Sequence, residues 1–64
     1  MRVGDLVKVR SHITANGVLL TKSVQGILIY RHGDGYHNVV LVNGVRIMTA
    51  YANLEVISES RRYG

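Results

Sequence analysis

Cysteine is absent from this chain of 64 residues, so neither a disulfide framework nor a thiolate metal site can stabilise the fold. Tryptophan and phenylalanine are absent as well, which leaves four tyrosines as the only aromatic residues and predicts an aliphatic core. One domain of this length is close to the lower limit at which a hydrophobic core alone holds a fold. We therefore expect self-association, or docking onto a larger assembly, to add stability.

Long apolar runs are also missing. The first residues, Met1 to Asp5, contain no apolar signal-peptide region, and no run approaches the roughly 18–20 residues that span a bilayer. These absences predict a soluble, cytoplasmic protein without a membrane partner. Acidic residues are scarce: 8 Lys and Arg stand against 4 Asp and Glu, which gives a formal net charge of +4. Such a balance attracts nucleic acid or an acidic protein surface, although many ordinary small domains share it.

Short aliphatic and β-branched runs recur at roughly ten-residue spacing, separated by Gly and Asn, which is typical of a small β-barrel or sandwich. The Asn-Gly pairs at 16–17 and 43–44 predict hairpin turns, because both residue types tolerate positive φ. The pattern predicts a barrel over residues 1–58 and a polar, basic tail over 59–64. The expected elements are strands at 6–10, 25–30, 37–42, 45–49 and 54–57, a 3₁₀ turn at 50–53 and a long loop at 11–24.

Alternation along these strands predicts which side chains form the core. In the first strand, Val7 and Val9 share one face, while Lys8 and Arg10 share the other. Gly26, near the start of the second strand, indicates a bulge or a close backbone approach. The expected core consists of Val7, Val9, Ile27, Ile29, Val39, Leu41, Val45, Ile47, Leu54 and Val56.

Four segments in this order resemble the motifs of SH3-like barrels. Gly4 to Val9 is similar to their GDxVxV opening, and 25–29 is similar to their second strand. Residues 42–46 resemble their distal hairpin, and 52–57 resemble their closing turn and strand. The resemblance covers about residues 3–58 and implies an all-β, five-stranded SH3-like barrel with a 3₁₀ turn before the last strand. Small proteins of this kind are often encoded by bacteriophages and bacteria, many as virion or accessory components, and the resemblance therefore implies a host-cytoplasm or virion location.

Catalytic groups are few. Ser11 and His12 are neighbours, but adjacent residues on a strand point to opposite faces and cannot form a nucleophile–base pair. His32, Asp34 and His37 surround one glycine-rich loop and could gather around a divalent metal. The alternative is a solvated loop with a turn-forming Asp-Gly, and it is favoured because the spacing matches no established metal motif. We expect no enzyme activity, no cofactor, no metal and no small-molecule substrate.

One enzymatic family on this fold is the type II dihydrofolate reductases, which assemble into tetramers around a pore. The chain is similar to them at Gly4-Asp5, at Gly35-Tyr36 and at 52–55. Their pore depends on a Val-Gln-Ile-Tyr stretch, which here reads Val45-Arg46-Ile47-Met48 and lacks both the glutamine and the tyrosine. An oligomeric-pore reductase is therefore the third and least favoured function.

Nucleic-acid binding is the second hypothesis. Barrels of the KOW type hold nucleic-acid backbone with basic loops and stack bases on exposed aromatics. The alternative treats the cations as a solvated outer face and the tyrosines as amphipathic plugs at the barrel ends. The candidate nucleic-acid-binding residues are Lys8, Arg10, Lys22, Tyr30, Arg31, Tyr36 and Arg46.

Protein interaction is the leading hypothesis. A polyproline-binding groove is disfavoured, because such grooves are lined with aromatics, usually including Trp. Val18, Leu19 and Leu20 form three consecutive aliphatic residues in the long loop, and they are either an extra core layer or an exposed adhesive patch. We therefore expect a non-catalytic protein-interaction or structural module that works as an oligomer or within an assembly.

Overall fold

The computed structural model describes residues 1–58 of the chain, and the predicted tail at 59–64 lies outside them. Five strands form one antiparallel sheet in the order β4-β3-β2-β1-β5. The all-β class, the five strands and the 3₁₀ turn before the last strand are confirmed. The elements are β1 Leu6–Val9, β2 Val24–Tyr30, β3 Asn38–Val42, β4 Val45–Thr49, the 3₁₀ helix η1 Tyr51–Asn53, and β5 Leu54–Ser58.

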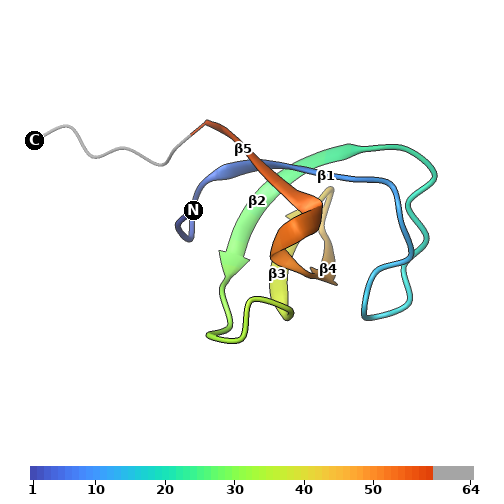
Figure 1. The fold of residues 1–64 in the computed structure, drawn as a ribbon. Helices are drawn as coiled ribbons and strands as arrows, with labels where there is room; N and C mark the ends of the chain where they lie inside the picture. Colours follow the sequence, from blue (N-terminus) through green and yellow to red (C-terminus); the bar gives the residue numbers. More distant parts are fainter. Residues whose placement is uncertain (59–64) are drawn as a thin grey trace, which may run out of the picture.

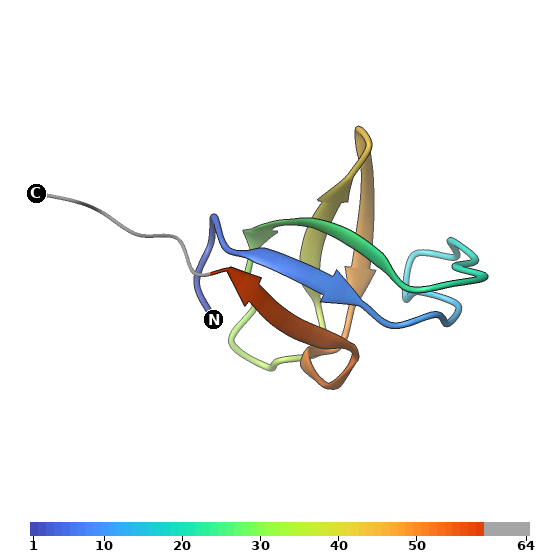
Figure 2. The same ribbon diagram turned by 90° about the horizontal axis from the view of Figure 1, so that it is seen from above.

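The sheet curls on itself along β2, which pairs with β1 in its first half and with β3 in its second half (Figure 1). Figure 2 shows the β3–β4 hairpin running across the direction of β1 and β5, so that the two halves of the sheet face each other. Their facing side chains enclose the core. Its fully buried members are Val7, Val9, Leu28, Val40 and Ile47, and Met1, Val18, Leu20, Val24, Val42, Leu54 and Val56 pack against them.

The predicted core residues of β1 and β5, and Ile47 of β4, are confirmed. The predicted core residues of β2 and β3 are wrong. Leu28 and Val40, which the expected core omits, are fully buried. By contrast, Ile27 is 40% exposed, Leu41 37% and Val45 50%. The residues wrongly placed in the core are Ile27, Ile29, Val39, Leu41 and Val45.

Gly26 explains why the inner and outer faces of β2 are exchanged. It is buried and lies opposite Val7 in the β1–β2 register, on the core side of the sheet. Since successive strand residues point to opposite faces, an inward Gly26 turns Leu28 inward and Ile27 outward. The faces of β3 are set in the same way, because Val40 pairs with Leu28 and therefore also points inward.

The inward position at Gly26 has no room for a side chain. A Cβ atom there would lie 2.5 Å from the carbonyl oxygen of Leu41 and 2.7 Å from side-chain carbons of Val40 and Val42. These distances are well inside van der Waals contact, and one of the opposing atoms belongs to the backbone. Of the two readings of Gly26 made from the sequence, the close backbone approach is the one that the structure shows.

Both Asn-Gly pairs lie at hairpin turns, but only the pair at 43–44 has positive φ at both residues. Asn43 and Gly44 have φ values of 49° and 82°, as a type I′ turn requires, and they join β3 to β4. In the long loop, the turn at Asn16 and Gly17 brings Ile13 and Leu19 into an antiparallel bridge. The hairpin-like shape expected for this loop is therefore confirmed.

The part of the chain that the structure describes contains no helix that could cross a membrane. The single helical element of residues 1–58 is η1, which has three residues. No helix there reaches the length and hydrophobicity that a span requires.

Replacing Gly26 with alanine is expected to lower the free energy of unfolding by about 2 kcal/mol or more, because the added Cβ meets the β3 backbone. Urea titration followed by circular dichroism measures the change. Gly33→Ala is the matched control: a Cβ at Gly33 meets no atom within 4 Å, so its effect should stay within about 0.5 kcal/mol. Equal stabilities of the two variants would contradict the proposed close approach.

Candidate interaction surface

The outer face of the sheet carries a row of apolar side chains from three adjacent strands. Leu6 of β1 pairs with Ile27 of β2, which in turn pairs with Leu41 of β3. All three point away from the core, and the latter two are exposed. Single exposed apolar residues are ordinary on a protein surface, whereas directly paired neighbours make a continuous patch.

A second row on the same face extends the patch toward the end of β2. The register shift between Leu28 and Tyr30 places Tyr30 opposite Val39, which pairs in turn with Met48 of β4. Tyr30 is half-exposed, and the other two are partly buried. The two rows together are called the outer apolar face below. Its members are Leu6, Ile27, Tyr30, Val39, Leu41 and Met48.

Charged residues border this face on two sides. Lys8 of β1 lies between Gln25 of β2 and Glu55 of β5 in the strand register. At the opposite border, Arg46 of β4 pairs with Leu41. The apolar rows are therefore flanked by both signs of charge, with a carboxylate and an ammonium group adjacent on one side.

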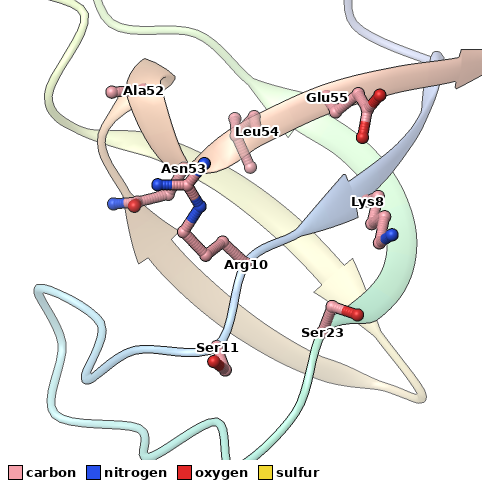
Figure 3. A pocket seen from close by; sticks show the side chains of 8 residues that line it. All are labelled: Lys8, Arg10, Ser11, Ser23, Ala52, Asn53, Leu54 and Glu55. Atoms are coloured by element: carbon pink, nitrogen blue, oxygen red, sulfur yellow. The ribbon is translucent and has the colours of Figure 1, made fainter.

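A hollow of about 340 Å³ opens beside this border, between the ends of β1 and β5 (Figure 3). Arg10 and Lys8 provide two cationic groups, and the backbone N–H of Arg10 donates to the carbonyl of Asn53 at 2.9 Å. Such a site suits an acidic group of a partner, while Glu55 on its rim limits the positive charge. The lining residues are Lys8, Arg10, Ser11, Ser23, Ala52, Asn53, Leu54 and Glu55.

The candidate nucleic-acid-binding residues occur in four parts of the fold. Lys8 and Arg10 share the hollow, and Lys22 is exposed in the long loop. Arg31 follows β2 and its Nη1 donates to the carbonyl of Met1 at 2.6 Å, near the N-terminus. The remaining members lie on the outer face or in the β2–β3 loop: Tyr30, Tyr36 and Arg46.

The three aliphatic residues of the long loop divide between core and surface. Val18 and Leu20 are partly buried and pack against the core, whereas Leu19 between them is exposed. Leu19 bridges to Ile13, which is also exposed. The local alternation of a short hairpin accounts for this division.

His12 is held at both ring nitrogens by the fold. Its Nδ1 lies 2.6 Å from the carbonyl oxygen of Arg10, and its Nε2 lies 2.7 Å from Oγ1 of the buried Thr49. Asn53 also donates to the same hydroxyl, at 3.3 Å. His12 thus joins the long loop to β4, and its neighbour Ser11 lines the hollow instead.

In the β2–β3 loop, the structure brings together the three residues that were considered as metal ligands. Nδ1 of His32 lies 3.1 Å from Oδ1 of Asp34, and Nδ1 of His37 lies 2.6 Å from Oδ2. The pKa of Asp34 is lowered to about 2, chiefly because the backbone N–H of Tyr36 donates to its carboxylate. Desolvation opposes this lowering, and the hydrogen bond from His37 and the charges of both histidines lower the pKa further.

Comparisons with protein-family models, with curated proteins and with solved structures found no significant match. The resemblance to SH3-like barrels stays a prediction from the sequence motifs. The same holds for a bacteriophage origin and for the likeness to reductases or KOW-type barrels. The function must therefore be argued from the surfaces themselves.

The outer apolar face is the feature that the sequence reasoning missed. The expected core wrongly contains Ile27 and Leu41. Every position from 27 to 30 and from 39 to 42 is apolar or aromatic, so alternation does not indicate which face is buried. Gly26 was the available signal, since a glycine at a close approach belongs on the crowded inner side.

Carbon-detected NMR titration of Asp34 should give a midpoint near pH 2 in the native protein. His37→Gln should raise this midpoint only part of the way to the ordinary aspartate pKa of 3.8, because the Tyr36 amide still donates. The folded-state pKa is the lower one, so ionised Asp34 stabilises the fold above about pH 4, and the effect disappears as the pH falls toward 2. An ordinary midpoint in the native protein would contradict the loop geometry.

Proposed function

We propose that this protein is a non-catalytic interaction module that associates with a second copy of itself through the outer apolar face. The observation that supports the proposal is the continuous row of Leu6, Ile27 and Leu41 across three paired strands. Exposed patches of this kind mark protein contact sites in soluble proteins. A role as a virion or accessory component, which the sequence resemblance implies, stays part of the proposal.

A second copy is favoured as the partner because the charged border carries both signs. In a two-fold contact each patch meets its own copy, so Lys8 or Arg46 of one protomer can approach Glu55 of the other. A border of one sign would instead repel a second copy. Ile27 and Leu41 are 40% and 37% exposed, so completing the burial of each contributes about 1 kcal/mol, and a two-fold axis counts each side chain twice.

The small core gives self-association a thermodynamic reason. Within residues 1–58, the fully buried apolar set consists of five aliphatic residues, of which two come from β1. A domain with so small a core gains a large share of its stability from any further apolar burial. Covering the outer apolar face would add a second buried layer to the other side of β1, β2 and β3.

Face-to-face contact is preferred over strand addition at β4, because the long loop already covers that edge. The backbone N–H of Ala15 donates to the carbonyl of Met48 at 2.8 Å. The side chain of Asn16 accepts from the N–H of Met48 at 3.0 Å and donates to the carbonyl of Arg46 at 2.9 Å. These bonds occupy the groups that an added strand would need.

Ile27→Glu is expected to weaken self-association roughly 30-fold or more, because it places a charge in the centre of the contact. Sedimentation velocity over a range of protein concentrations measures the dissociation constant. Ile13→Glu is the matched control: Ile13 is 69% exposed in the long loop, so the same substitution there should leave association unchanged.

Three outcomes would contradict the proposal. A native protein that remains monomeric at millimolar concentration has no such contact. Equal weakening by both substitutions would indicate a general charge effect. A dimer that survives Ile27→Glu would place the contact elsewhere, with pairing along β5 as the next surface to test. Circular dichroism establishes that each variant is folded before its association is compared.

Nucleic-acid binding is tested separately on a single-stranded DNA column with a salt gradient. The separate positions of the candidate residues predict elution at low salt, and little change when Arg10 and Arg46 are replaced with alanine. Strong retention at physiological salt, reduced by Arg10→Ala, would instead favour a nucleic-acid interface centred on the hollow.

A further inference from the structure

The β2–β3 loop gathers three side chains that commonly ligate transition metals. His32, Asp34 and His37 each offer one ligand atom, and these atoms all lie within 4.8 Å of one another. The carboxylate of Asp34 stands between the two imidazoles, with one oxygen facing each Nδ1. The ring centroids of His32 and His37 lie 5.6 Å apart, and the rings meet edge to face. All three ligands come from six consecutive residues, so the loop forms a local chelate.

The loop is held in this shape by bonds to the rest of the fold. The N–H of Gly35 donates to the carbonyl of His32 at 3.1 Å and closes a turn, and Gly35 adopts a positive φ of 76°. The carbonyl of Gly35 in turn accepts from the N–H of Tyr51 at 2.8 Å and from the side chain of Asn38 at 3.1 Å. Little ordering of the backbone remains to be done when a ligand binds.

The carboxylate is also oriented by the backbone. Oδ1 of Asp34 accepts from the N–H of Tyr36 at 2.8 Å, which is the kind of outer hydrogen bond that fixes a metal-binding carboxylate. The group therefore keeps its position between the imidazoles without depending on either histidine alone.

His32 cannot satisfy both of its close neighbours with one nitrogen. The N–H of Asp34 points at Nδ1 of His32 from 3.2 Å and needs a lone pair there, while Oδ1 of Asp34 at 3.1 Å needs a proton. In the tautomer that accepts from the amide, an imidazole lone pair faces a carboxylate oxygen. Two atoms that ligate the same cation also face each other with their lone pairs. Bonds of about 2.0–2.2 Å to a shared ion place such atoms about 3 Å apart.

We propose that His32, Asp34 and His37 bind one divalent transition-metal ion of the zinc class. Imidazole nitrogen suits Zn²⁺, Co²⁺, Ni²⁺ and Cu²⁺, whereas Mg²⁺ and Ca²⁺ select oxygen ligands, so the donor set separates these two groups of cations. Three protein ligands leave at least one coordination position to water. The two imidazoles must approach each other slightly, which exposed side chains can do by rotation.

This site shares no residue with the proposed dimer contact, although the ring centroid of His32 lies 6.3 Å from that of Tyr30 in the outer apolar face. The ligands are all exposed and lie in the β2–β3 loop, and none of them belongs to the outer apolar face. A bound ion would tie the end of β2 to the start of β3 and stabilise the folded state relative to the unfolded one. Failure of one proposal would therefore leave the other unaffected.

Isothermal titration of untagged protein with zinc chloride, in a buffer that does not chelate metal, tests the proposal. We expect one Zn²⁺ per chain, a rise in melting temperature with added Zn²⁺, and no comparable effect of Mg²⁺. Asp34→Asn and His37→Gln should each weaken the affinity roughly 10-fold or more. Amide chemical shifts should change mainly between residues 32 and 38, and Co²⁺ should give a visible ligand-field spectrum that develops only at higher Co²⁺ concentration in both variants.

Glu55→Gln and His12→Gln are the matched controls, because they remove an exposed carboxylate and an imidazole outside the loop. They should leave Zn²⁺ affinity unchanged. The proposal is overturned if native protein shows no heat and no shift changes at millimolar Zn²⁺. It is equally overturned if Asp34→Asn and His37→Gln bind as native, or if the controls lose affinity to the same extent. Melting curves without metal establish that each variant is folded.

Discussion

The close approach of β2 to β3 at Gly26 is the constraint on which the rest of the structure depends. A glycine at this point allows the β3 backbone to cross the inner side of β2 at a distance that excludes any Cβ. The sheet can then curl until its two halves enclose Leu28, Val40 and the valines of β1. Since strand faces alternate, the same choice sends Ile27 and Leu41 outward. Core and exposed surface are thus fixed by one backbone contact.

Element positions could be predicted from the sequence, because turn chemistry is local. Asn43 and Gly44 tolerate the positive φ values of a type I′ turn, and the strands on both sides follow within one residue of expectation. Face assignment could not be predicted in the same way. In β2 and β3 both faces are apolar, so alternation carries no information about which side is buried. Only the crowding at Gly26 distinguishes the two, and crowding is a tertiary property.

The candidate sites show the same division between local and tertiary information. Proximity of His32, Asp34 and His37 followed from their spacing, but the spacing matches no established motif and favoured a solvated turn. The spacing does not determine how the carboxylate is oriented between the rings. That orientation depends on the Tyr36 amide and on the anchored carbonyl of Gly35. Likewise, the row across β1, β2 and β3 exists only through strand register, which no single strand encodes.

A buried amide links the loop to the barrel interior. Asn38 is 1% exposed, and its Nδ2 donates to both Gly35 and Thr49 carbonyls, at 3.1 and 3.2 Å. Its Oδ1 is left without a hydrogen-bond partner among the residues that the structure describes, which costs about 1–3 kcal/mol in an interior. A leucine or valine here would avoid that cost but would leave the Gly35 carbonyl with the Tyr51 N–H as its remaining donor. The amide of Asn38 therefore ties the β2–β3 loop to the start of β3 and to the end of β4, and this tie fixes the shape of an exposed loop from inside the fold.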